Sequence, residues 1–206
     1  MRGKFVTFEG CEGSGKSTQL RLLSEKLTAL GVEFIVTREP GGSEIAEKIR
    51  TIILDKQNGA MCDECEALLY AASRIQHLHD TVEPALAAGK LVLCDRYVHS
   101  SLAYQGYARG LGAKYVETIN ATALKNYTPD LTLFFNISPE DAFIRKHGAD
   151  QNDRMEQQGL GFHKKVYGGY RELLNDYPCM VSVECKGNKF ETAEKIFNLL
   201  KDRGII

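Results

Sequence analysis

An eight-residue segment near the N-terminus, GCEGSGKS at residues 10–17, constrains the possible folds of this 206-residue chain more than any other feature. It matches the pattern G-x-x-x-x-G-K-[ST], in which glycine-rich backbone, a lysine and a hydroxyl hold the phosphates of a nucleotide. The flanks support the match, because Phe5–Phe8 is an apolar run typical of a strand and Thr18–Leu27 has a helical pattern. The sequence therefore predicts a phosphate-binding loop between the first strand and the first helix of an α/β fold.

This loop also predicts which residues bind a nucleoside triphosphate. We expect Lys16 to reach the β- and γ-phosphates as a catalytic residue, and Ser17 to ligate Mg²⁺. The glycines let backbone N–H groups turn toward phosphate oxygens, and the following helix adds its dipole. The expected donor-binding residues are Gly10, Cys11, Glu12, Gly13, Ser14, Gly15, Lys16, Ser17 and Thr18.

The rest of the chain alternates short apolar runs with longer helical patterns. Strands are predicted at Lys4–Glu9, Glu33–Thr37, Lys90–Asp95, Leu131–Ile137 and Met180–Glu184. Helices are predicted at Lys16–Leu30, Ser43–Leu54, Glu64–Ala88, Tyr115–Asn126, Pro139–Lys146, Leu160–Asn175 and Thr192–Lys201. Because the strand runs are almost continuously apolar, we expect a doubly wound five-stranded parallel sheet with helices on both faces.

Residues 1–206 are predicted to form a single domain, with a mobile lid at about residues 145–158, where the polar segment His147–Gln158 interrupts two helical patterns. The formal net charge of −1, from 26 basic and 27 acidic residues, favours neither nucleic acid nor an anionic membrane as a partner. No apolar run approaches the roughly 20 residues of a membrane helix, and no signal peptide is evident, so a reduced cytoplasmic protein is expected.

Charged residues follow two of the predicted strands. Asp95 and Arg96 end the third strand, and Arg38 ends the second. In such a sheet these tips lie beside the phosphate loop, so we expect Arg96 to hold a phosphate through its two-pronged guanidinium and Asp95 to orient Mg²⁺-bound water. A switch-type GTPase is disfavoured because the chain has no D-x-x-G, although Asn188–Glu191 is similar to the base-reading motif N-K-x-D.

An ordered series of motifs resembles the bacterial thymidylate kinases. It comprises Gly10–Thr18, Arg38–Gly41, Tyr70–Arg74–His77, DRYVHSSLAYQG at Asp95–Gly106 and DRME at Asp153–Glu156. The resemblance implies a P-loop kinase fold, transfer of a phosphoryl group from ATP to dTMP, and a homodimer formed through helices of the first half of the chain.

The resemblance also implies roles for individual residues. Arg38 and Arg96 would bind the dTMP phosphate, and Glu12 would accept a hydrogen bond from the sugar 3′-hydroxyl. Tyr70 stands where the family usually has a phenylalanine that stacks on thymine, and Arg74, four residues later on one helical face, would donate to a base carbonyl. The remaining contacts to base or sugar would come from Ser101 and Gln105, with Tyr104 crowding the ribose 2′ side.

The charge of the transition state needs a cation, and the variable loop positions, Cys11 to Ser14, supply none. In one subgroup of the family this cation comes from the lid, which makes Arg145, Lys146 and Arg154 the candidates, with Arg154 preferred as a catalytic residue.

Two alternatives stay open: another P-loop nucleotide or deoxynucleoside kinase, and a non-catalytic nucleotide-binding switch. Arginines at two strand tips favour a phosphorylated acceptor over a nucleoside. Cys62 and Cys65 have zinc or redox spacing, but without a second pair we interpret them as cysteines at a helix start.

Overall fold

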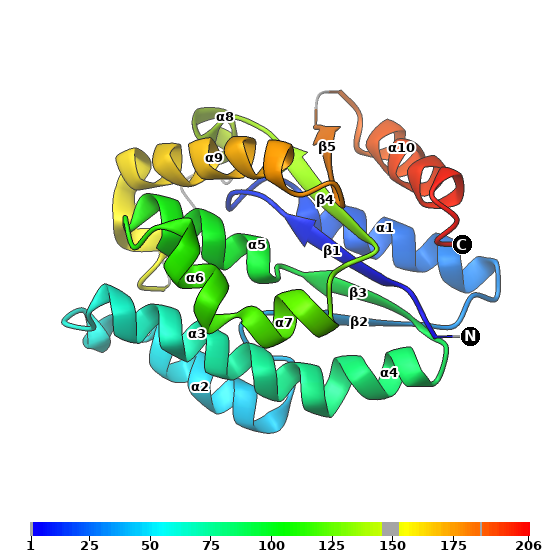
Figure 1. Cartoon of the computed structure of the whole chain (residues 1–206). Coiled ribbons are helices and arrows are strands. Elements are labelled where there is room, and N and C mark those ends of the chain that lie inside the picture. Colours follow the sequence, from blue (N-terminus) through cyan, green and yellow to red (C-terminus); the bar gives the residue numbers. More distant parts are fainter. Residues whose placement is uncertain (1, 146–152, 186) are drawn as a thin grey trace.

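The computed structural model describes residues 2–145, 153–185 and 187–206, which form one parallel sheet flanked by helices (Figure 1). The strands are β1 (Phe5–Glu9), β2 (Phe34–Arg38), β3 (Leu91–Asp95), β4 (Leu131–Asn136) and β5 (Met180–Glu184). They are ordered β2-β3-β1-β4-β5, and every neighbouring pair is parallel. The predicted doubly wound, five-stranded parallel sheet is confirmed.

The long connections between the strands contain the helices. These are α1 (Lys16–Ala29), α2 (Glu44–Leu54), α3 (Asp63–His77), α4 (Glu83–Ala87), α5 (Val98–Ser101), α6 (Ala113–Ile119), α7 (Ala121–Asn126), α8 (Pro139–Arg145), α9 (Gly159–Asp176) and α10 (Lys189–Asp202). Two π-helical segments, η2 (Leu78–Val82) and η3 (Leu102–Ala108), continue α3 and α5, and short 3₁₀ turns are η1 (Lys56–Asn58) and η4 (Glu156–Gln158). No described helix is long and apolar enough to cross a membrane.

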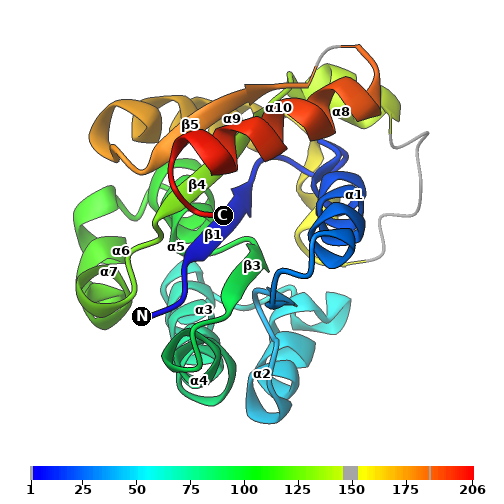
Figure 2. The ribbon, with the colours of Figure 1, turned by 90° about the vertical axis from the view of Figure 1, so that its right-hand side faces the viewer.

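Different helices cover the two faces of the sheet (Figures 1 and 2). On one face, Val6 and Phe8 pack with apolar residues of α1 and α10. On the other face, Phe5 packs beneath α4 and α7, and Phe134 packs beneath η3 and α9. Side chains of successive strand residues point to opposite faces, so a strand buried on both is apolar throughout. This double burial explains why continuous apolar runs identified the central strands β1, β3 and β4, whereas the edge strands β2 and β5 are partly exposed.

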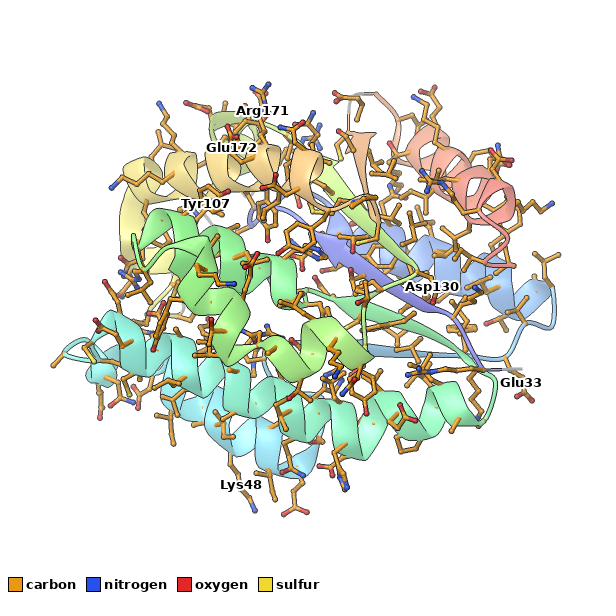
Figure 3. The ribbon with its side chains drawn as sticks, viewed as in Figure 1. Glu33, Lys48, Tyr107, Asp130, Arg171 and Glu172 are labelled. Atoms are coloured by element: carbon orange, nitrogen blue, oxygen red, sulfur yellow. The ribbon has the colours of Figure 1, made fainter. Side chains whose placement is uncertain are left out.

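The register of the central strands aligns their carboxyl ends. Phe8 of β1 pairs with Asp95 of β3, and Asp95 pairs with Arg38 of β2. The loop after β1, the turn after β3 and the end of β2 therefore emerge at one edge. Asp130 and Glu33 lie near the amino ends of strands, toward the opposite end of the sheet (Figure 3).

The structure differs from the sequence prediction in three helical regions. The helix expected at Tyr115–Asn126 is divided at Asn120 into α6 and α7. The helix expected at Glu64–Ala88 is interrupted by η2 before it continues as α4. The segment after Asp95, for which no helix was predicted, forms α5 and η3. Of the expected lid, residues 146–152 lie outside the described residues, and Asp153–Gln158 form a turn and η4.

Candidate active site

The phosphate loop is built as the sequence predicted, between β1 and α1. Gly10, Gly13 and Gly15 have positive φ angles of 143°, 74° and 97°, which favour glycine. A Cβ at Gly10 would also lie 3.0 Å from the Phe135 carbonyl oxygen. The Lys16 ammonium donates to the carbonyls of Gly10 and Cys11 at 3.2 and 3.1 Å. Burial, and then the nearby Arg96 charge, lower the pKa of Lys16, so a bound polyphosphate would stabilise its charged form.

A pocket over this loop gathers the predicted phosphate and metal residues. Its lining consists of Glu12, Gly13, Ser14, Gly15, Lys16, Ser17, Thr18, Arg38, Glu39, Arg50, Asp95 and Arg96. Four of these side chains are cationic, which concentrates positive charge where phosphates would lie. We call this the phosphate pocket.

Asp95 and Ser17 share the phosphate pocket, and their chemistry suits a magnesium ion. Asp95 Oδ1 is buried and has no hydrogen-bond partner among the described residues. Mg²⁺ commonly takes one or two carboxylates and completes its shell with water and substrate phosphates. Within residues 2–145, 153–185 and 187–206 no group of three or more His, Cys, Asp or Glu side chains could hold a metal alone. One carboxylate and one hydroxyl beside a phosphate site fit the magnesium arrangement.

A second pocket adjoins the first and contains most of the predicted acceptor residues. Its lining consists of Glu12, Glu39, Pro40, Arg50, Leu54, Tyr70, Arg74, Arg96, Tyr97, Ser100, Ser101, Tyr104, Gln105, Asp153, Met155 and His163. We call this the acceptor pocket. Glu12, Glu39, Arg50 and Arg96 line both pockets, so the two meet at these side chains.

Arg96 stands at the junction in an unusual backbone conformation. It is the one non-glycine residue with a positive φ, 70°, among the described residues. Such a conformation costs on the order of 1–3 kcal/mol and persists only where its surroundings enforce it. Its guanidinium donates to Glu12 at 2.5 Å and to the Gly10 carbonyl at 2.9 Å, and lies over the Tyr104 ring. The loop and the acceptor pocket thus hold Arg96 from two sides.

Glu9 supports this arrangement from beneath, and sequence reasoning missed it. Its buried carboxylate accepts from the backbone N–H of Tyr97 at 2.8 Å and of Ser100 at 3.2 Å. It also accepts from the hydroxyls of Ser100 and Tyr170 at 2.6 and 2.8 Å. Burial raises the pKa of Glu9, against the lowering effect of these hydrogen bonds. The sequence signal was weak, because Glu9 reads only as the last residue of a strand.

Arg74 reaches the acceptor pocket from α3 and is almost fully buried. Its guanidinium donates to Glu39 at 2.7 Å, to Asn120 at 2.5 Å, and to the Tyr97 carbonyl and Ser101 hydroxyl at 3.2 and 3.1 Å. A guanidinium has five N–H donors. Four are engaged by described residues, so one remains for a ligand. Ser101, which the sequence also assigned to the site, therefore contacts Arg74 directly.

Aromatic and amide side chains complete the acceptor pocket. The Tyr104 hydroxyl is buried without a hydrogen-bond partner among the described residues, and burial raises its pKa. Burial likewise raises the pKa of Tyr70, so both phenols stay neutral. Gln105 donates from its amide nitrogen to Glu66 at 2.8 Å. The structure thus brings Tyr70, Arg74, Ser101, Tyr104 and Gln105 together, as the sequence predicted.

Two arginines of the site differ from expectation. Arg38 lines the phosphate pocket only, and its half-exposed guanidinium pairs with Glu47 at 3.0 Å. Arg50 lines both pockets and donates to the Pro40 carbonyl at 2.8 Å, after the cis peptide Glu39–Pro40. Burial, and then repulsion by Arg38, lower the pKa of Arg50. Sequence reasoning missed Arg50 because one arginine in an amphipathic helix is usually solvated.

The expected lid cations lie in different places. Arg145 donates to the Cys185 carbonyl at 2.6 Å, and Lys146 is outside the described residues. Arg154 is buried, with Nε donating to the Ile53 carbonyl at 2.9 Å and Nη2 lying 2.6 Å from Glu66 Oε2 in an ion pair. Arg154 is not in the described lining of either pocket, although its neighbours Asp153 and Met155 are.

Known proteins are similar to this chain over most of its length. A family profile described as Thymidylate kinase matches residues 8–196. A thymidylate kinase of Clostridium novyi (strain NT) is 47% identical over 202 residues, covering 97% of each chain. One from Finegoldia magna is 46% identical over 202 residues, covering 98% of this chain and 100% of the relative. One from Lactobacillus helveticus is 51% identical over 181 residues, covering 86% and 85%.

Proposed function

This chain belongs to the thymidylate kinase family, and from that premise we propose how its residues carry out the family reaction. The activity is transfer of the γ-phosphoryl group of ATP to dTMP, which gives ADP and dTDP. One observation supports the assignment of residues above all others. A phosphate pocket over the glycine-rich loop meets a second pocket containing Tyr70, Arg74 and Gln105, and Arg96 lines both.

ATP supplies the phosphoryl group from the phosphate pocket. The backbone from Gly10 to Thr18 and the Lys16 ammonium bind its β- and γ-phosphates. We propose that Mg²⁺ is held there by the Ser17 hydroxyl and, directly or through water, by Asp95, whose buried Oδ1 has no described protein partner. When bound there, Mg²⁺ would neutralise part of the charge of the phosphates.

The acceptor dTMP occupies the second pocket. Its phosphate lies at the junction, where Arg96 binds it with help from Arg38 and Arg50. Thymine stacks on Tyr70, and the remaining N–H of Arg74 donates to a base carbonyl. Tyr104 borders the ribose and disfavours a 2′-hydroxyl through crowding, which selects deoxyribose by exclusion. Glu12 accepts a hydrogen bond from the sugar 3′-hydroxyl, and this bond replaces part of the contact between Glu12 and Arg96.

Cationic side chains that already line the pocket stabilise the negative charge of the phosphoryl group during its transfer. Lys16, Arg38, Arg50 and Arg96 all line the phosphate pocket. Positioning and electrostatic stabilisation carry most of phosphoryl-transfer catalysis, and the attacking phosphate oxygen is already anionic, so no general base is required. A catalytic role for Arg154 remains a prediction. It requires that Arg154 leave its ion pair with Glu66.

We also propose that the protein acts as a homodimer. The helix pair α2–α3 exposes four large apolar side chains, Ile45, Ile52, Leu68 and Ile75, each about half accessible. On each helix the two are seven residues apart and therefore share one face. An exposed apolar face on packed helices suits a second copy of the chain. All six cysteines are free, which supports the proposed reducing, cytoplasmic location.

An assay of ADP release tests the function directly. Purified enzyme receives ATP and Mg²⁺ with dTMP, dUMP, dCMP, thymidine or no acceptor. We expect rapid ADP formation with dTMP and little with dCMP or thymidine. A preference for thymidine would overturn the phosphorylated acceptor, and ADP release independent of any acceptor would indicate a nucleotide-hydrolysing switch.

A further inference from the structure

Glu66 is a fully buried carboxylate that the reaction described above does not use. It lies in the first turn of α3 and contacts three side chains from distant parts of the chain. Oε1 accepts from the Gln105 amide nitrogen at 2.8 Å and from Arg109 Nε at 3.3 Å. Oε2 accepts from Arg109 Nη2 at 2.9 Å and lies 2.6 Å from Arg154 Nη2. The two arginines neutralise the charge that burial would otherwise penalise.

The contact with Gln105 determines how its amide is turned. A carboxylate only accepts hydrogen bonds, whereas a glutamine amide has one donating and one accepting end. Because the NH₂ end faces Glu66, the Oε1 branch points away from it. Gln105 also lines the acceptor pocket, so the group it offers to a base there is preferentially an acceptor.

We propose that Glu66 is a positioning residue that sets base selectivity by fixing the Gln105 amide with its oxygen toward the base. The proposal rests on the proposed function, in which Gln105 contacts the base of dTMP. Thymine carries N3–H, a donor that this oxygen accepts. Cytosine carries a lone pair at N3, which faces the same oxygen without a proton between them. A site built to pair one group rejects the analogue lacking it, because a buried polar atom is left unpaired.

The neighbours of Glu66 predict what a neutral amide at this position does. In Glu66→Gln, the short contacts of Arg109 and Arg154 at the Oε2 position require an oxygen there, since guanidinium groups only donate. The new NH₂ then takes the Oε1 position and faces Gln105, while Arg109 Nε, which loses its 3.3 Å contact with Oε1, keeps Asp63 Oδ1 at 3.3 Å as its partner. Gln105 must offer its oxygen to that NH₂, so its own NH₂ turns toward the base, where it pairs with cytosine N3.

The test compares kcat/KM for dTMP, dCMP and dUMP on single preparations of wild type and Glu66→Gln. Ratios measured on one preparation cancel the fraction of active enzyme, so partial loss of folding does not obscure the result. We expect the dTMP/dCMP ratio to fall about tenfold or more, with kcat/KM for dCMP rising in absolute terms. The dTMP/dUMP ratio should stay unchanged, because uracil has the same N3–H as thymine. An unchanged dTMP/dCMP ratio, or a parallel fall in both ratios, overturns the proposal.

Arg109→Lys is the matched control. It keeps the charge and perturbs the same buried cluster but leaves the Glu66–Gln105 contact, so both ratios should match wild type. Glu66→Asp, which retains an acceptor-only group, should keep the preference for dTMP over dCMP. The variant Gln105→Ala distinguishes the base contact of Gln105 from the positioning role of Glu66. If that variant leaves the dTMP/dCMP ratio unchanged, the base contact of the proposed function fails; if it lowers the ratio and Glu66→Gln does not, the Glu66 proposal alone fails.

Discussion

Three buried acids hold the arginines and the glutamine of the site in place. Glu9 fixes the backbone after Arg96, Glu39 pairs with Arg74, and Glu66 accepts from Gln105. Each of the three is more deeply buried than an unpaired acid tolerates. Their partners come from distant segments, so single-residue effects at the site depend on groups behind the pocket wall.

Tyr170 offers a test of the support beneath Arg96. Tyr170→Phe removes a hydroxyl that donates to Glu9 at 2.8 Å and lies 2.9 Å from the Ser100 hydroxyl. We expect kcat/KM for dTMP to fall about tenfold, since Glu9 loses a hydrogen bond and Arg96 is less well held. Steady-state kinetics with dTMP as the varied substrate measures this. The control is Tyr177→Phe, at the C-terminal end of the same helix, α9. It removes a hydroxyl that donates to Glu117 and should change kcat/KM for dTMP little. Equal losses in both variants would contradict a specific role for Tyr170.

His99 predicts a stability change at acid pH. It is buried, its Nε2 has no hydrogen-bond partner among described residues, and burial lowers its pKa to about 3 from an ordinary 6.5. The unfolded chain therefore binds a proton that the folded chain excludes. With respect to this group, the free energy of unfolding is highest above pH 6.5. It falls by up to about 1.4 kcal/mol per pH unit as the pH decreases from 6.5 toward 3.

Urea unfolding at a series of pH values measures the effect. His99→Asn should show a shallower loss of unfolding free energy than wild type between pH 6.5 and 4.5. The exposed His79 provides the comparison, and His79→Asn should follow the wild-type pH dependence more closely. If His99→Asn and wild type lose stability in parallel, His99 is not the titrating group.

Elements differ in how far the sequence predicts them, and burial explains the difference. The central strands β1, β3 and β4 were found because strands covered on both faces are apolar throughout, and the partly exposed edge strands β2 and β5 were found from their short apolar runs. The segment α5–η3 was missed as a helix because it is buried nearly all round, which removes the amphipathic pattern. Its motif residues Ser101, Tyr104 and Gln105 nevertheless line the acceptor pocket, where the sequence predicted substrate contacts. Glu9, Arg50 and Glu66 could not be assigned, since their roles depend on partners that lie 10 to 161 residues away in the sequence, which no local pattern reveals.

Within the expected lid, Arg154 can be tested as a catalytic cation. Arg154 now pairs with Glu66, and its backbone N–H donates to the Leu54 carbonyl at 3.1 Å. If Arg154 moves to the phosphates during turnover, Arg154→Ala should lower kcat by about 10³-fold or more. Single-turnover and steady-state kinetics at saturating ATP and dTMP measure this. Arg145→Ala is the companion variant, because Arg145 contacts only the Cys185 carbonyl among its described hydrogen bonds. A near-wild-type kcat in Arg154→Ala, with a lowered Tm, would assign Arg154 to anchoring alone.

At the scale of the whole molecule, the sheet edge and the helix pair α2–α3 are connected. Arg50 on α2 and Tyr70 and Arg74 on α3 line the acceptor pocket, while the same two helices expose Ile45, Ile52, Leu68 and Ile75 on their outer side. A dimer formed through that outer side would steady the helices that carry the acceptor residues.

Leu68 provides the test of this association. Leu68→Glu places a charge in the middle of the proposed dimer face, where burial in an interface would be costly. We expect sedimentation velocity to show a dimer for wild type and mainly a monomer for Leu68→Glu. Leu30→Glu, a similarly exposed leucine at the end of α1, is the matched control and should remain dimeric. A monomeric wild type at micromolar concentration would exclude the proposed homodimer.

The burial of Arg74 has a consequence for molecules designed to block the enzyme. The guanidinium proposed to read the base also joins α3 to Glu39, Asn120 and the α5 segment through the protein interior. Exchanging it would leave several interior groups unpaired, at a cost of about 1–3 kcal/mol each. A substitution of Arg74 that gave resistance to an inhibitor bound through this residue would therefore also destabilise the fold. A substitution of the half-exposed Arg38 would not carry the same cost.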